Sequence, residues 1–517
     1  MPTYLTPGVY VEEVQSGARP IEGVGTAVAA FVGFARSGPF HEPTLVTGWD
    51  QYTQRFGGFT EDAYLPHAVY GYFANGGGAA YVVRVGGSDL DSSAPAAAAG
   101  PEQRAARPVE FGGFLLAARP GVTGVSVEIA DADGENPPED RFRLLVHRDG
   151  AVAETFEVSA RRNVKGYLVA QARGSALIEV TEQRGTAQSR PANQTAALPD
   201  APAAVPAPAA GSAARLDPAE YVGDAAARTG LGGLETIDEI TMVAVPDLMG
   251  SHQRGDIDAE GVRTVQLAVI SHCEQMGDRV AVLDAPPGLS AQQVRTWRND
   301  EAGYDSRYAT LYYPWIRVFD PAAGRNTTVP PSGHIAGVWA RSDAERGVHK
   351  APANEVIRGA VDLELRLSKG EQDLLNPIGV NCVRTFPGRG IRIWGARTLS
   401  SDPAWRYLNV RRLFNYLEES ILLGTQWVVF EPNDDRLWSS IRRNVTAFLT
   451  EEWRGGALFG RTAAEAFYVK CDRDNNPQES IDQGRVICEI GVAPVKPAEF
   501  VVFRLAQFSD STSLIDE

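Results

Sequence analysis

The stretch Ile240-Thr-Met-Val-Ala-Val245 decides the fold class, because a short, almost wholly apolar run of this kind is typical of a strand buried inside a sheet. A second apolar run, Val280-Ala-Val-Leu283, follows it. The residues between them, Gly261–Met276, have the length and spacing of a helix. Strand, helix and strand in this order predict an α/β fold, and the same pattern extends over residues 217–495.

Two amphipathic helices and two further strands are expected later in the same region. Asp402 is predicted to be the N-cap of the first helix, with Pro403 at its first position. The apolar face of this helix comprises Val410, Leu413, Phe414, Leu417 and Ile421. The apolar face of the second comprises Leu437, Ile441, Val445, Phe448 and Leu449, with Arg442 and Arg443 on its outer side. The strands are expected at Trp427–Phe430 and Arg485–Val492.

Residues 21–90 form a first, separate piece of this core, with strands expected at Thr26–Phe34 and Ala80–Val85 and helices at Trp49–Phe56 and Ala63–Phe73. Between the two pieces, residues 108–182 predict a small β-rich domain, because short strands alternate there with turns. Its strands are expected at Val125–Ile129, Phe142–Val146, Glu154–Val158 and Leu177–Val180. Linkers rich in Ala and Pro flank it at 88–108 and 183–215, so it is interpreted as an insertion on flexible tethers.

The two ends of the chain each contain one strand without a local partner. The N-terminal segment 1–20 holds a strand at 9–14, and the C-terminal segment 496–517 holds one at 499–505. An unpaired strand leaves backbone N–H and C=O groups unsatisfied, so each is expected to pair elsewhere. The residues concerned are Val9, Tyr10, Val11, Val14, Phe500, Val501, Val502, Phe503 and Leu505.

The composition excludes several classes of protein. The 517 residues contain 49 Lys and Arg against 65 Asp and Glu, and the resulting net charge of −16 argues against a protein that coats nucleic acid. The longest apolar run, 27–34, is too short to span a bilayer, and the first residues lack the features of a signal peptide. The four cysteines show no zinc or redox spacing. We therefore expect a soluble protein made in a reducing cytoplasm.

Motifs of catalysis are absent from the sequence. It has no phosphate-binding loop, no H-E-x-x-H and no G-x-S-x-G, so no catalytic, cofactor-binding or metal-ligating residues are predicted and no cofactor is expected. The stretch from Arg384 to Arg412 holds seven arginines and one acid, Asp402. This stretch is either a solvated face or a docking face for an acidic partner.

Several motifs, in a shared order, resemble the contractile tail sheath family, which comprises the sheaths of phage tails, R-type pyocins and extracellular contractile injection systems. They span about 390 of the 517 residues. The motifs are Pro7-Gly-Val-Tyr-Val-Glu-Glu13, Phe31-Val-Gly-Phe-Ala35, Trp49-Asp-Gln-Tyr52, Phe73-Ala-Asn-Gly-Gly77, Val243-Ala-Val-Pro-Asp247, Ser332-Gly-His-Ile-Ala-Gly337, Gly347-Val-His-Lys-Ala-Pro-Ala-Asn354, Asn376-Pro-Ile-Gly-Val-Asn381, Gly390-Ile-Arg-Ile-Trp-Gly395 and Asn409-Val-Arg-Arg412.

The resemblance implies a multi-domain α/β (α+β) fold with a mixed-sheet sheath core, an inserted β-rich outer domain and extended strand arms at both ends. It also implies a structural function without enzymatic activity. Subunits would stack in helical rings around an inner tube, exchange their arms with neighbours, and contract to drive the tube through a target envelope. This mechanism needs no ATP at the subunit, in agreement with the missing phosphate loop.

The partners implied are further copies of the chain, an inner tube protein, and baseplate and terminal cap proteins, with no nucleic acid and no direct membrane insertion. Assembly is expected in the cytoplasm, within a phage tail-like particle that is either retained there or released on lysis. The C-terminal part of the core would face the tube. The candidate tube-facing residues are Arg442 and Arg443, followed by Arg406, Arg411 and Arg412.

Two other functions remain open at this point. One is a soluble α/β enzyme whose active site is assembled from distant residues. The other is a different tail or baseplate component.

Overall fold

The computed structural model describes residues 20–60, 63–86, 217–504 and, except for 120–123, 133–137, 139, 149, 162–163, 165 and 183–189, residues 109–198. The chain divides into two compact units, residues 1–93 with 214–517 and residues 94–213. The predicted arm residues Val9, Tyr10, Val11, Val14 and Leu505 lie outside the described residues.

An eight-stranded sheet forms the centre of the larger unit. Its strands run in the order β18-β17-β13-β12-β11-β1-β3-β2. Their bounds are β1 (Val28–Gly33), β2 (Thr44–Val46), β3 (Ala79–Arg84), β11 (Met242–Ala244), β12 (Val280–Asp284), β13 (Ala309–Tyr313), β17 (Val380–Phe386) and β18 (Gly390–Ile393). The pairs from β17 to β3 are parallel, and β18 and β2 close the edges antiparallel. Every residue of β11, β12 and β13 is buried, as their continuous apolar sequence predicts.

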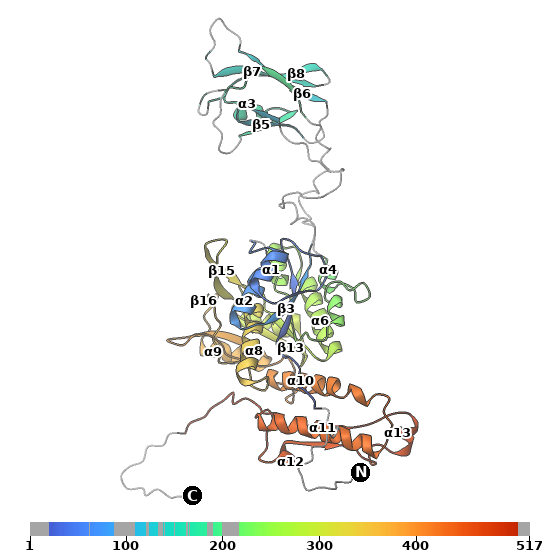
Figure 1. The fold of residues 1–517 in the computed structure, drawn as a ribbon. Helices are drawn as coiled ribbons and strands as arrows, with labels where there is room; N and C mark the ends of the chain where they lie inside the picture. Colours follow the sequence, from blue (N-terminus) through green and yellow to red (C-terminus); the bar gives the residue numbers. More distant parts are fainter. Residues whose placement is uncertain are drawn as a thin grey trace, which may run out of the picture. The chain divides into compact units, whose positions relative to one another are not determined.

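Helices cover both faces of this sheet, so the larger unit has an α/β layered core. On one face lie α1 (Trp49–Phe56), α2 (Leu65–Asn75) and α8 (Ser332–Arg346). On the other face lie α4 (Pro218–Val222) and α6 (Ala259–Met276) (Figure 1), together with α5 (Leu248–Arg254) and α7 (Ala291–Thr296). The remaining elements here are α9 (Lys369–Leu375), the short 3-10 helices η2 (Gly232–Thr236) and η4 (Asn376–Ile378), and the π-helix η3 (Trp297–Ala302). The predicted α/β class is therefore confirmed.

Helices α2 and α8 approach each other so closely that only glycine fits between them. A Cβ at Gly333 would be 2.3 Å from the Cα of Ala68, and one at Gly337 would be 2.4 Å from the carbonyl oxygen of Tyr72. From the other side, a Cβ at Gly71 would be 2.3 Å from the His334 ring.

The larger unit also contains a three-stranded sheet with the order β15-β14-β16. Its strands are β14 (Ile316–Asp320), β15 (Arg325–Val329) and β16 (Ala360–Leu363).

The C-terminal part of the larger unit has a core of its own. It is formed by α10 (Leu408–Gly424), α11 (Asp435–Arg454), α12 (Ala463–Ala466), α13 (Gln478–Asp482), the turn η5 (Gln426–Val428) and the antiparallel pair β19 (Phe467–Lys470) and β20 (Glu489–Val492). The predicted apolar faces of α10 and α11 supply Leu413, Leu417, Ile441, Val445 and Phe448 to this core. Asp434 caps α11 by accepting hydrogen bonds from the N–H groups of Arg436 and Leu437.

Three local predictions in this part are wrong. Helix α10 begins at Leu408 and not after Asp402, because the Leu408 N–H is bonded to the Ala396 carbonyl in a short bridge that precedes the helix. Asp402 instead caps a turn through the N–H of Ala404. Trp427–Phe430 is not a strand, since turn hydrogen bonds satisfy its backbone and Phe430 has a φ of 69°. The strand predicted from Arg485 begins only at Glu489.

The smaller unit contains two antiparallel sheets that share one hydrophobic core. One sheet has the order β4-β5-β9 and the other β10-β6-β7-β8. Their bounds are β4 (Val109–Phe111), β5 (Phe114–Ala118), β6 (Val125–Asp131), β7 (Arg141–Arg148), β8 (Ala151–Ser159), β9 (Ile178–Glu182) and β10 (Gln194–Ala197), with one helix, α3 (Leu168–Ala172). Strand β10 lies within the predicted tether, which is a correction: it pairs with β6, and Leu198 beside it is buried in the core.

Candidate functional site

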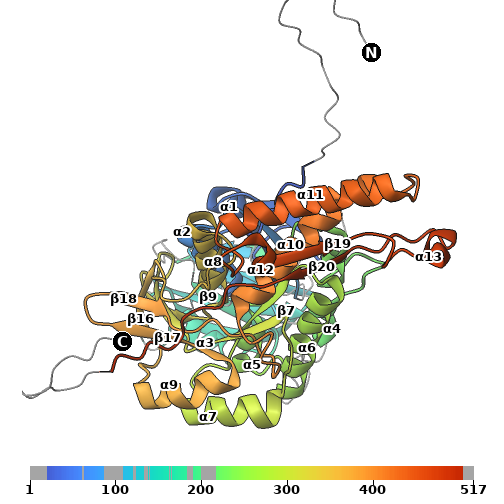
Figure 2. The ribbon, with the colours of Figure 1, turned by 90° about the horizontal axis from the view of Figure 1, so that it is seen from below.

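The strands β19 and β20 form a two-stranded sheet in the C-terminal part of the larger unit. Phe467 pairs with Val492 and Lys470 pairs with Glu489. Within the described residues the sheet holds these two strands, and the chain beyond β20 bridges to Leu458 at Pro494. The outer edges of β19 and of β20 itself therefore have no ladder partner there. Helix α11 runs alongside the pair (Figure 2). A two-stranded sheet is marginal by itself and is stabilised here by packing against the helix.

The C-terminal segment approaches along a groove and is held in it at Glu499. The groove has a volume of about 890 Å³ and is lined by residues of α9, the region 346–354, β17 and the segment 495–501 itself. Arg397 donates two hydrogen bonds to the Glu499 carboxylate, at 2.9 and 2.7 Å, and Asn376 donates a third at 2.8 Å. Burial would raise the pKa of Glu499, but the hydrogen bonds from Arg397 and Asn376 outweigh it and lower the pKa.

Beyond this anchor the chain exposes four apolar side chains in succession. Phe500, Val501, Val502 and Phe503 are between 67% and 84% exposed. Residues 499–504 form no strand in this single chain, although their sequence predicts one. A run of aromatic and β-branched residues is typical of a strand, and a strand requires a partner edge. The anchor at Glu499 was not predicted, because Arg397 and Glu499 are separated by 102 residues.

The first described residues run along α10. Ile21 is buried against Gly424, the N–H of Val24 donates to the hydroxyl of Ser420 at 3.1 Å, and Gly23 lies so close to Tyr416 that a Cβ would be 2.1 Å from its hydroxyl oxygen. This strap holds the start of the described chain on the C-terminal helices. The predicted N-terminal arm immediately precedes it.

Two of the five candidate tube-facing arginines are buried, which corrects the prediction. Arg412 forms a bidentate ion pair with Asp343 of α8, at 2.6 and 2.9 Å, and both side chains are almost fully buried. Arg411 is 1% exposed and lies over the rings of Trp405 and Tyr308, at 4.6 and 4.7 Å from their centroids. Both arginines therefore hold the fold together and offer no surface for docking.

The other three candidates remain at the surface of the single chain. Arg443 and Arg406 are exposed, and Arg442 is half-buried. The guanidinium of Arg442 donates to the carbonyl of Cys471 at 3.0 Å, which directs this side chain toward the end of β19. Arg443 donates to the Ser440 hydroxyl on the same helix. Of the predicted pair, Arg443 is thus the side chain that faces away from the core.

Two family models match the chain. The model described as the phage tail sheath protein central domain matches residues 228–399, and the phage tail sheath C-terminal domain matches residues 400–508. Together they cover more than half of the sequence and contain helices α5 to α13, with both glycine positions of α8, and the Glu499 anchor. The chain belongs to the contractile tail sheath family. The predicted resemblance is confirmed.

The sheath chain is also similar to individual tail sheath proteins. It is 28% identical over 270 residues to the tail sheath protein of Vibrio phage KVP40, covering 48% of this chain and 39% of the phage protein. It is 27% identical over 251 residues to a putative prophage major tail sheath protein of Pseudomonas aeruginosa, covering 47% and 62%. The chain therefore spans 39% and 62% of the length of these two relatives.

Solved structures match over nearly the whole sheath chain. The helical sheath of the anti-feeding prophage in its contracted state is 25% identical with a TM-score of 0.58, and the match covers 98% of this chain and 100% of that one. The sheath of the PVC extracellular contractile injection system, also in its contracted state, has a TM-score of 0.58 at 23% identity, with coverage of 98% and 99%. The multi-domain sheath fold is therefore confirmed.

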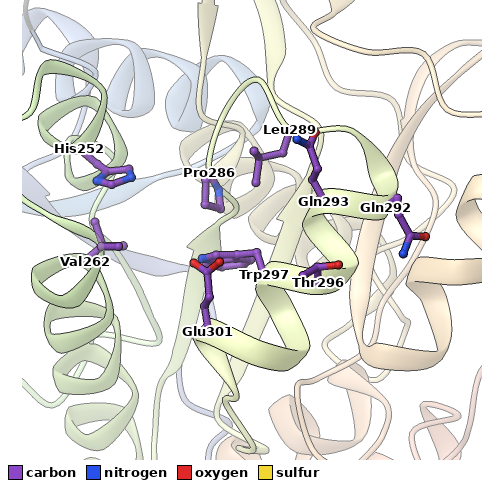
Figure 3. Close-up of a pocket in the computed structure, with 10 residues that line it drawn as sticks. His252, Val262, Pro286, Leu289, Gln292, Gln293, Thr296, Trp297 and Glu301 are labelled. Atoms are coloured by element: carbon purple, nitrogen blue, oxygen red, sulfur yellow. The ribbon is translucent and has the colours of Figure 1, made fainter.

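A second cavity of about 360 Å³ lies between α6 and α7 of the sheath core. His252 and Val262 line it from one side, and Leu289, Gln293 and Trp297 from the other (Figure 3). The Nδ1 atom of His252 is hydrogen-bonded to the Ile257 carbonyl.

The described part of the chain shows neither a metal-ligand cluster nor a membrane-spanning helix. Among the described residues, no group of three or more His, Cys, Asp and Glu side chains could hold a metal ion. None of the helices in that part of the chain combines the length and the apolar character that a membrane span requires.

Proposed function

We propose that the protein is a structural sheath subunit that polymerises helically around an inner tube and contracts to drive that tube through a target envelope. The particle would be a phage tail-like contractile injection system, assembled in the cytoplasm. Support comes from the match to sheaths solved in their contracted state. The family is structural, and we infer that the protein is not an enzyme.

The observation that carries the proposal is the exposed apolar segment Phe500–Phe503, in a chain that also has a two-stranded sheet with open edges. Exposing four such side chains in succession to water is unfavourable, at roughly 25 cal/mol per Å² of apolar surface. A strand added to a sheet edge satisfies both its backbone groups and its side chains. We infer that the occupant of each open edge of β19 and β20 is an arm of a neighbouring copy.

The groove anchor gives this arm a fixed starting point. Because Arg397, Asn376 and Tyr407 all bind the Glu499 carboxylate, residues up to 499 stay with their own subunit. An extended residue spans about 3.3 Å, so the eighteen residues from 500 to 517 reach roughly 60 Å. That length is sufficient to cross to a neighbour. Further partners would be the tube, baseplate and terminal cap proteins.

The outer face of α11 is our candidate for contact with the inner tube. Its exposed residues include Arg436, Arg443 and Arg454, while the opposite face is packed into the C-terminal core. Charged contacts at an exposed face are individually weak and solvated, so many together can hold a tube and still release it. Arg406 is the second candidate position.

The arm proposal is tested by deleting residues 1–20 and, separately, by Val502→Pro. The deletion removes the N-terminal arm, and proline at position 502 removes a backbone N–H that an added strand would donate. Both variants should leave a folded subunit that no longer forms cylinders in negative-stain microscopy. Val502→Ala is the matched control, because it shortens the side chain and keeps the N–H, and it should assemble. Cylinders of wild-type length from Val502→Pro would refute the exchange of this arm.

The tube proposal is tested by Arg443→Glu, with Arg325→Glu on β15 as the control for an equal change in charge at another exposed arginine. The first variant should give more empty or prematurely contracted sheaths when it is co-expressed with the tube, and the second should not. If Arg443→Glu encloses tubes as well as the wild type at low and at high salt, α11 is not the tube-facing helix.

A further inference from the structure

Two of the four cysteines meet at the end of the β19–β20 pair. The last paired residues of the two strands are Lys470 and Glu489, and the next residue on each strand is a cysteine, Cys471 and Cys488. Facing residues on antiparallel strands have Cα atoms about 4.5–5.5 Å apart, which lies within the range of about 4.4–6.8 Å that disulfides adopt. The sequence alone did not indicate this pair, because Cys471 and Cys488 are 17 positions apart and lack the C-x-x-C spacing of a redox motif.

The two thiols lie close together in the reduced chain. Each is the largest single influence on the pKa of the other. The neighbouring Cys488 thiol and the charge of Arg442 lower the pKa of the Cys471 thiol, whereas Cys471 and burial raise the pKa of Cys488. The thiolate that thiol exchange requires therefore forms more readily at Cys471. Cys471 is fully buried, whereas Cys488 is partly exposed and can be reached from solvent.

The loop between the cysteines holds them in position. Asn476 binds both backbone groups of Ile487: its amide donates to the carbonyl at 2.9 Å, and its oxygen accepts from the N–H at 2.6 Å. On the other strand, the carbonyl of Cys471 accepts a hydrogen bond from Arg442 of α11. Both cysteines are therefore fixed by neighbouring hydrogen bonds, so that a bond between their sulfurs requires little movement of the backbone.

We propose that Cys471 and Cys488 are a modification site: they form an intrachain disulfide when the protein meets a disulfide oxidant such as glutathione disulfide. One protein thiolate attacks a sulfur of glutathione disulfide, which forms a mixed disulfide and releases one glutathione thiol. The second protein thiolate then attacks the protein sulfur of the mixed disulfide and releases the second glutathione thiol. Two electrons and the two thiol protons pass to glutathione, and the protein gains one S–S bond.

The bond would close residues 472–487, including α13, into a covalent loop. It would also fix the register of β19 against β20 at their open end. The inference stands on the fold alone and does not require that the sheet receives arms from neighbours. The other two cysteines, Cys273 and Cys382, are buried in the main core and serve as internal controls.

The experiment uses the purified full-length protein, incubated with glutathione disulfide or with dithiothreitol, then denatured, alkylated and digested with trypsin. We expect the number of alkylated cysteines to fall from four to two in the oxidised sample. On a gel without reductant the intact oxidised protein should remain monomeric. After digestion, the tryptic peptide Cys471–Arg473 should be recovered joined to the peptide that begins at Val486. Cys488→Ser should retain its other three thiols, and Cys471→Ala provides a second variant if the first folds poorly.

Three outcomes would overturn the proposal. One is the survival of all four thiols in the folded wild-type protein. Another is glutathione left permanently on Cys488, because it would mean that Cys471 cannot reach the mixed disulfide. The third is a disulfide that joins two chains instead of one.

Discussion

Replacing Asp343 with Ala should destabilise the subunit strongly, because it leaves the Arg412 guanidinium buried without its counter-ion. The two side chains are 4% and 3% exposed and share two hydrogen bonds. Thr26 joins the same network: its hydroxyl donates to Asp343 at 2.7 Å, and its carbonyl accepts from Arg412 at 3.0 Å. The pair thus connects α8, α10 and the N-terminal strap.

The magnitude follows from burial. Breaking a buried ion pair on one side costs about 3–5 kcal/mol, whereas replacing both partners with apolar residues of similar size is often neutral. We therefore expect Asp343→Ala to lower the free energy of unfolding by about 3–5 kcal/mol. The double variant Asp343→Leu with Arg412→Met should recover most of that loss, although Thr26 then loses its partner. Urea unfolding, followed by tryptophan fluorescence, measures both.

The matched control is the pair of Arg473 and Asp435, which has similar geometry at 2.7 Å but is largely exposed. Arg473→Ala should unfold at the wild-type urea concentration, since solvent screens an exposed pair. Two results would contradict this reasoning: Asp343→Ala being no more destabilising than Arg473→Ala, or the double variant being less stable than Asp343→Ala. Either would mean that the buried ion pair of Arg412 and Asp343 does not stabilise the fold as inferred.

Three further predictions concern packing, pH and domain organisation. Gly333→Ala should cost roughly 1–3 kcal/mol in urea unfolding, because the new Cβ would lie 2.3 Å from the Ala68 backbone. Burial lowers the pKa of His334 to about 3, with a smaller contribution from nearby His67, so the folded chain binds fewer protons there than the unfolded chain below pH 6.5. The stability advantage of the wild type over His334→Gln should therefore shrink by about 1.4 kcal/mol per pH unit from pH 6.5 downward, and an unchanged difference would contradict this. Replacing 100–215 with a short Gly/Ser linker should leave a folded core with an unchanged unfolding midpoint, and insoluble protein would count against an independent insert.

The helices and strands that could be predicted are those in which the local pattern of apolar residues already indicates which side chains are buried. The strands β11 and β12 are continuous apolar runs, and the apolar face of α11 repeats at helical spacing, so local pattern and burial agree. The strand β10 was missed because Gln194–Ala197 carries little β-propensity, and its position is determined by the edge of β6.

The errors in the candidate site have a different cause. Seven arginines within 29 residues favour a solvated face, but two of them are buried against residues that include partners distant in sequence. Asp343 is 69 residues from Arg412, and the rings around Arg411 come from separate segments. No periodicity in one segment can indicate an ion pair with another. Such pairs are specified by the topology that brings α8 and α10 together.

The insertion of the smaller unit between β3 and α4 has a consequence for how this chain could evolve. The strands β3 and β11 both flank β1, and their parallel register is continuous although about 130 residues separate β3 from α4. Lengthening a flexible connection is inexpensive, at about 0.6 kcal/mol for each doubling. The connection between β3 and α4 should therefore tolerate replacement of the inserted domain by another. Natural recombination could replace the β-rich module with another, and a protein engineer could fuse a fluorescent or adhesive domain at the same position without altering the pairing of the central strands.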